Sequence, residues 1–164
     1  MSGAEAGAGG IRRDGTVLGF DVGSRRIGVA VGSAFGNGAR AIAVIDVHND
    51  QPNWNALDKV QREWRPAGLV VGDPLTLEGG DQPARQRAHA FARALHARYQ
   101  LPVVLIDERA SSIEAAQRFA NDRAEGRKRR RDAAALDAVA AAVIVERWLA
   151  SPDDAIDLAA LPAA

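Results

Sequence analysis

The chain has 164 residues, a formal net charge of +0 at pH 7 and no cysteine. Its 47% hydrophobic and 26% charged residues are typical of an ordinary globular protein, and its length suits one domain. The lack of cysteine excludes disulfides and thiolate chemistry and favours a cytoplasmic location. No apolar run reaches the roughly 18 residues of a membrane span, so no membrane partner is expected.

The first half of the chain predicts a meander of strands. Residues 1–14 are expected to be a flexible tail, after which apolar runs predict strands over 16–22, 27–31 and 41–47. The turns between them are short and rich in glycine, so the three strands should pair in antiparallel fashion. In the second strand, one face carries only glycine and alanine and is unusually bare.

Strands then alternate with helices, which implies parallel pairing through crossovers. The expected elements are a helix over 53–64, a strand over 69–72, a helix over 83–99, a strand over 103–107 and helices over 111–124 and 132–149. The sequence therefore predicts an α/β domain over 15–150, with a mixed five-stranded sheet of three antiparallel and then two parallel strands, flanked by helices. Residues 151–164 are expected to be a second flexible tail.

Three carboxylates stand where structure alone would not require them. Asp21 interrupts an apolar strand, Glu108 follows a buried strand at its carboxyl end, and Asp137 lies on the apolar side of the last helix. Each has an ordinary alternative: a turn former, a surface ion pair, or a partner for amides near a helix start. Together the three acids favour a shared divalent cation, since a buried carboxylate is costly without a counter-charge.

Clustered cations could hold a polyanion despite the neutral total charge. Two arginines lie in the turn after Asp21, one follows Glu108, and five consecutive cations precede the last helix. Solvated surface charge is the alternative for each, although like charges in a run repel one another unless a polyanion is bound. The candidate nucleic-acid contacts are Arg25, Arg26, Arg109, Arg127, Lys128, Arg129, Arg130 and Arg131.

Four segments, in order, resemble the motifs of the YqgF/RuvX family. Residues 19–30 read GFDVGSRRIGVA, 71–79 read VGDPLTLEG, 104–112 read VLIDERASS and 136–141 read LDAVAA. One departure is Asp73, where the family usually has an apolar residue, and it is expected to add a charge beside the cleft.

The resemblance implies a ribonuclease H-like nuclease related to the junction resolvase RuvC, with Asp21, Glu108 and Asp137 as catalytic residues that bind Mg²⁺ or Mn²⁺. The implied substrate is structured RNA, namely the 5′ end of pre-16S rRNA during ribosome biogenesis, and the alternative is branched DNA cut by a Holliday junction resolvase. A monomer or weak homodimer is expected.

Two rival functions stay open. A non-catalytic RNA-binding ribosome-assembly factor would not need the acids and would bind without metal. The Asp21-Val22-Gly23 segment also resembles the phosphate loop of the actin and sugar-kinase superfamily, but 164 residues leave no room for the second domain that such proteins need.

Overall fold

The computed structural model describes residues 11–12, 14–36, 38–74, 82–107 and 133–161. Within these residues the strands form one seven-stranded sheet in the order β4-β3-β2-β1-β5-β6-β7. The strands are β1 Thr16–Val22, β2 Arg26–Ser33, β3 Gly38–His48, β4 Gln51–Pro52, β5 Gly68–Asp73, β6 Val103–Asp107 and β7 Ile156–Asp157. The α-helices are α1 Trp54–Trp64, α2 Gln82–Tyr99 and α4 Ala133–Ala150.

The pairing confirms the predicted mixed sheet. β1 pairs with β2 and β2 with β3 in antiparallel fashion, whereas β1–β5 and β5–β6 are parallel. Two short strands extend the predicted five at the edges, β4 beside β3 and β7 beside β6. The predicted helix over 111–124 lies outside the described residues.

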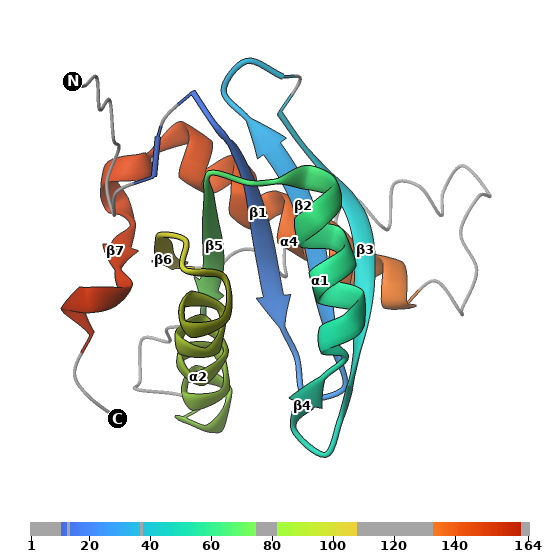
Figure 1. Ribbon diagram of the computed structural model, residues 1–164. Coiled ribbons are helices and arrows are strands. Elements are labelled where there is room, and N and C mark those ends of the chain that lie inside the picture. The colour runs from blue at the N-terminus through green and yellow to red at the C-terminus, as the bar shows by residue number, and fades with distance from the viewer. Residues whose placement is uncertain (1–10, 13, 37, 75–81, 108–132, 162–164) are drawn as a thin grey trace.

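Helices cover both faces of the sheet. Figure 1 shows α1 and α2 on one face and α4 crossing the other. Alternation along β1 divides its side chains between the two layers: Leu18 and Phe20 pack toward α1 and α2, while Val17 packs with the residues of α4. Asp21 has the same parity as Val17 and therefore belongs to the α4 face.

α4 packs directly against glycines of β1 and β2. A Cβ added at Gly28 would overlap the carbonyl oxygen of Asp137, and one at Gly19 or Gly32 would overlap the side chain of Val145. The bare face predicted for the second strand is thus the surface on which the helix rests. Only glycine at these positions allows the helix backbone to approach the sheet so closely.

An ion-pair network joins α1 to α2. Asp58 accepts hydrogen bonds from Arg98 Nε at 2.8 Å, Arg98 Nη2 at 2.7 Å and Tyr99 Oη at 2.6 Å. The bonds from Arg98, and secondarily that from Tyr99, hold the pKa of Asp58 well below its usual range. Burial, followed by the hydrogen bond to Asp58, raises the pKa of Tyr99. The two helices on this face are therefore fastened to each other as well as to the sheet.

Beyond α4 the described part of the chain forms three further short elements, one of which pairs with the sheet. A 3-10 helix over Pro152–Asp154 leads into β7, which pairs antiparallel with β6, and a second 3-10 helix spans Leu158–Ala160. The sequence predicted no element here. A two-residue strand has no periodicity to detect, so pairing with the edge of β6 decides its conformation.

Candidate functional site

The fold brings Asp21 and Asp137 to one edge of the sheet. Asp21 is the penultimate residue of β1 and is half-buried, and its register partner on β2 is Gly28. The backbone of Asp137, one turn into α4, rests directly on Gly28. Two acids separated by 116 positions in sequence, 21 and 137, therefore meet on the α4 face through a single glycine.

Arg26 supplies positive charge to this pair of acids. Its Nε donates to Asp137 Oδ2 at 2.7 Å, and both side chains remain partly accessible, at 38% and 31%. A tight turn delivers the arginine: the Gly23 amide donates to the Arg26 carbonyl at 2.9 Å, and a Cβ at Gly23 would lie 2.7 Å from that oxygen. Arg25, in the same turn, is exposed. Arg26 thus lies beside Asp137, and Arg25 is the adjoining, exposed residue of the turn.

The remaining predicted site residues lie outside the described residues. These are Glu108, Arg109, Arg127, Lys128, Arg129, Arg130 and Arg131. The described strand that precedes Glu108 is β6, whose Val104 and Ile106 pack on the α4 face. Within the described part of the chain, no group of three or more His, Asp or Glu side chains is placed to hold a metal ion.

The expectation for Asp73 was wrong. The residue ends β5 on the opposite face from α4, and only 2% of it is exposed. Arg85 Nε donates to its Oδ1 at 3.2 Å, and His89 Nε2 lies 3.1 Å from its Oδ2. Arg85 and His89 are four residues apart and share one face of α2. The extra carboxylate is therefore neutralised beneath α2 and adds no charge to the crevice under α4.

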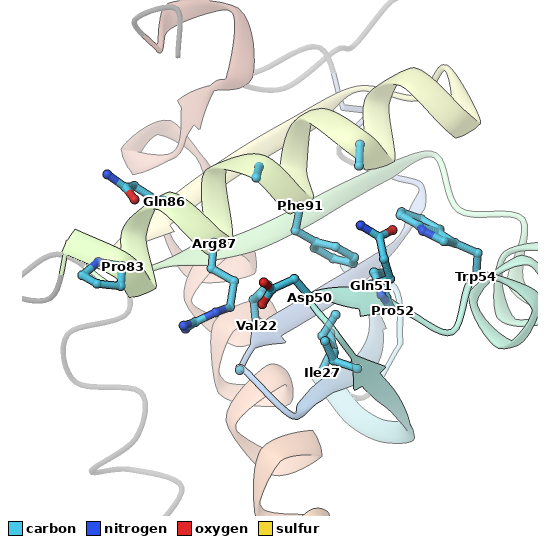
Figure 2. Close-up of a pocket in the computed structure, with 14 residues that line it drawn as sticks. Val22, Ile27, Asp50, Gln51, Pro52, Trp54, Pro83, Gln86, Arg87 and Phe91 are labelled. Atoms are coloured by element: carbon cyan, nitrogen blue, oxygen red, sulfur yellow. The ribbon is translucent and has the colours of Figure 1, made fainter.

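A groove that the sequence did not indicate opens beside the turn of β1 and β2. It holds about 400 Å³ of open space between α2, the end of β1 and the β3–β4 turn (Figure 2). Its apolar lining includes Val22, Ile27, Val47, Trp54, Ala90 and Phe91, and its polar lining consists of Asp50, Gln51, Gln86 and Arg87. These residues come from β1, β2, β3, β4, α1 and α2 and from the turn between β3 and β4, so no local motif could have revealed the groove.

The arrangement suits a hard cation and a phosphate. Carboxylate oxygens are the ligands that Mg²⁺ and Mn²⁺ prefer, and Asp21 and Asp137 present theirs at one edge of the sheet. That a guanidinium already pairs with Asp137 indicates that this position favours a positive charge. The donor set therefore fits a divalent cation, with Arg25 and Arg26 at hand for phosphate oxygens. No helix of the described residues is long and apolar enough to cross a membrane.

Known proteins of one family are similar to this chain over most of its length. Residues 15–151 match the family described as RuvX, Holliday junction resolvase. A protein of Xanthomonas axonopodis pv. citri named "Putative pre-16S rRNA nuclease" is 78% identical over 148 residues, which cover 90% of this chain and 96% of that protein. A second protein of that name, from Xanthomonas euvesicatoria pv. vesicatoria, is 76% identical over 151 residues, covering 92% and 97%.

Solved structures establish the kind of fold. RuvC of Thermus thermophilus in complex with a Holliday junction substrate matches with a TM-score of 0.54 at 16% identity, covering 87% of this chain and 99% of that one. RuvC of the same organism in a second structure matches with a TM-score of 0.52 at 17% identity, with the same coverage. The sheet and its helices thus have the ribonuclease H-like fold of these nucleases.

Proposed function

Because this chain belongs to the RuvX family and has the fold of a ribonuclease H-like nuclease, we propose that it is a divalent-metal-dependent nuclease that processes the 5′ end of pre-16S rRNA. The observation that carries the proposal is the convergence of Asp21 and Asp137 on Gly28, with Arg26 beside them. The names of the relatives that are 76–78% identical support RNA as the substrate.

Asp21, Glu108 and Asp137 are the proposed metal ligands and catalytic residues. Glu108 belongs to the set because it comes two positions after Ile106, which faces α4 at the carboxyl end of β6. When bound, Mg²⁺ or Mn²⁺ would activate a water and polarise the phosphoryl oxygens. The protein's own task is to fix the carboxylates on a rigid strand and helix, so that they need not reorganise during the reaction.

Arginines are the proposed phosphate contacts. Arg25 and Arg26 follow Asp21 at the β1–β2 turn, and a guanidinium can donate two parallel hydrogen bonds to one phosphate. Arg109 and the cations at 127–131 extend the same proposal to a longer stretch of backbone. Since the whole chain carries no net charge, such local groups would have to supply the attraction for RNA.

Holliday junction resolution is the second candidate, favoured by the description of the family that the chain matches. A resolvase that cuts both strands symmetrically needs two active sites and hence a dimer. RNA trimming needs one site only and is compatible with the expected monomer or weak homodimer. The oligomeric state on each substrate therefore bears on the choice.

Cleavage of end-labelled pre-16S 5′-leader RNA, beside a four-way DNA junction, tests the proposal. The protein is incubated with Mg²⁺, Mn²⁺ or EDTA, and Asp137→Asn is the matched variant because it keeps the shape of the side chain while removing its charge. We expect RNA trimming that requires metal and falls by about 100-fold or more in the variant, since the variant loses one negatively charged ligand of the metal ion that would stabilise the transition state.

Other results would redirect the assignment. Symmetric nicking of the junction alone would establish the resolvase. RNA binding that needs no metal, is unaffected by Asp21→Asn and is never followed by cleavage would contradict the nuclease and establish a non-catalytic ribosome-assembly factor.

A further inference from the structure

The groove shown in Figure 2 lies next to the proposed catalytic edge but on the other face of the sheet. Val22 and Gly23 follow directly after Asp21 and form one wall, and Ile27, next to Arg26, lines the same groove. One hairpin therefore carries Asp21 and Arg26 on the proposed catalytic side and a groove wall on the other. Anything bound across the turn of this hairpin would touch both.

The chemistry of the groove combines a flat apolar interior with polar groups at the rim. Phe91 projects from α2 toward β1 and stacks on Trp54, with ring centroids 6.0 Å apart and an interplanar angle of 23°. Ile27 and Val22 complete the apolar lining. Such a surface suits a planar, weakly polar group, and the open space of about 400 Å³ lies within the range of small-ligand sites.

Polar side chains at the rim could form hydrogen bonds to the edge of that planar group. Asp50 and Gln51 approach from the β3–β4 turn, where Asn49 and Asp50 have φ values of 52° and 64°. Two successive left-handed residues are typical of a type I′ hairpin turn, which fixes the position of Asp50. Gln51 adds an amide that can both donate and accept. The rim thus offers both hydrogen-bond donors and hydrogen-bond acceptors.

Arg87 completes the groove with a positive charge. Its side chain points from α2 toward Val22, and within the described residues it forms no ion pair, although Asp50 borders the same groove. A guanidinium in this position can stack on an aromatic ring or bind a phosphate. Arg87 can therefore take the phosphate of a bound nucleotide, while Asp50 leaves the groove as a whole without net charge.

We propose that this groove binds one unpaired nucleobase of the nucleic acid that is cleaved, with the adjoining phosphate held by Arg87 and the β1–β2 turn. The inference rests on the proposed nuclease function and adds to it a preference for substrates with a single-stranded nucleotide beside the scissile bond. Recognition of this kind is usual for RNA, whose unstacked bases insert into aromatic pockets and are read at their edges.

A pair of alanines on α2 provides a matched test. Ala90 lines the groove, whereas Ala97 is exposed on the same helix and does not. Ala90→Trp fills the groove and Ala97→Trp adds the same side chain elsewhere. Binding of a fluorescent RNA hairpin with a short single-stranded extension is measured by anisotropy in EDTA, so that no cleavage occurs, with intact extensions and with extensions carrying one abasic site.

For the wild-type protein, one abasic position should weaken binding on the order of ten-fold, the value of one stacked base. Ala90→Trp should bind the intact RNA as weakly as wild type binds that abasic RNA and should no longer respond to the lesion, whereas Ala97→Trp should behave as wild type. Arg87→Gln should weaken binding without filling the groove, and thermal unfolding of each variant excludes a folding defect.

Equal binding by Ala90→Trp and Ala97→Trp, or equal affinity of wild type for intact and all abasic RNAs, would overturn the groove proposal. If the same preparation still cut its substrate with metal and Asp137→Asn did not, the nuclease proposal would stand. A wild-type protein that neither binds nor cuts nucleic acid would overturn both.

Discussion

Arg26 occupies the position at which a cation would neutralise the carboxylates. Its Nε lies 2.7 Å from Asp137 Oδ2, and the side chains of both residues are partly accessible, so solvent weakens the pair. A divalent ion that binds Asp137 must compete with this guanidinium. Once released, the guanidinium is well placed for a phosphate oxygen, since its strand begins at the turn that borders Asp21.

Removing this competitor should tighten metal binding while weakening catalysis. For Arg26→Gln we expect the affinity of the nucleic-acid-free protein for Mn²⁺, measured by titration calorimetry, to rise by a factor of about three to ten, the equivalent of roughly 1 kcal/mol for an accessible pair. Cleavage should fall, because a phosphate contact is lost. Arg25→Gln, in the same turn, is the control: it should leave the Mn²⁺ affinity unchanged. Weaker Mn²⁺ binding by Arg26→Gln would contradict this account of the ion pair.

The proposed site depends on how closely α4 lies against β1 and β2. Gly19, Gly28 and Gly32 lie beneath the helix, and at Gly28 the contact is with helix backbone, which has little freedom to move aside. Asp137 therefore reaches the edge of the sheet through main-chain packing. Its placement is a property of the β2–α4 contact as much as of its own side chain.

Gly28→Ala should thus separate the two acids. The added methyl group would overlap the Asp137 carbonyl, so α4 must shift, at a cost of about 1–3 kcal/mol in the free energy of unfolding. We expect a lower midpoint of unfolding in urea. We also expect the cleavage rate to fall by more than the fraction of folded protein does. Gly36→Ala is the control, because the neighbour that it meets is the flexible Ser33 side chain at 3.2 Å. Wild-type activity in Gly28→Ala would refute the role given to this contact.

The α1–α2 network should give the protein a specific acid sensitivity. Hydrogen bonds from Arg98 and Tyr99 lower the pKa of Asp58 in the folded state, so the stabilisation is present above the unfolded value of about 3.9 and is lost as the pH falls below it. In urea unfolding between about pH 4 and pH 2, Asp58→Asn should lose less stability than wild type does. Arg98→Gln should flatten the profile in the same way. Parallel profiles for all three proteins would show that the network does not contribute.

The elements that the sequence predicted best are those with a strong local pattern. β1 and β6 have the predicted bounds because each is an apolar run closed by an acid or glycine, and α1 begins after Asn53, whose Oδ1 accepts from the Ala56 amide at 3.2 Å. β7 and the location of Asp73 under α2 were missed, since both depend on partners distant in sequence. Asp21 and Asp137 were predicted from polarity in apolar settings, and their convergence through Gly28 required the fold.

The neutrality of the whole molecule must be reconciled with the proposed binding of RNA. With 21 acidic and 21 basic residues, the total charge offers no long-range attraction for a polyanion. Binding must then depend on a few phosphate contacts, those proposed for Arg25, Arg26, Arg87, Arg109 and the cations at 127–131. The affinity of such a protein for RNA should fall with salt concentration. The steepness of that fall should follow the small number of charges that touch phosphate, and not the total number of basic residues.

Neutralising two residues of the basic run at 127–131 measures how many of their charges touch phosphate. Each cation that contacts a phosphate contributes about 0.7 to the slope of log K against log salt for single strands and about 0.9 for duplexes. Replacing Arg129 and Arg130 by Gln should therefore lower the slope by about 1.4 to 1.8 if both touch the substrate, while the rate of cleavage at saturating RNA stays unchanged. Arg12→Gln is the control, because Arg12 already pairs with Asp14 at 3.1 Å on an exposed segment away from the site. An unchanged slope would mean that Arg129 and Arg130 do not touch phosphate, and the phosphate contacts would then have to come from the other proposed cations, namely Arg25, Arg26, Arg87, Arg109, Arg127, Lys128 and Arg131.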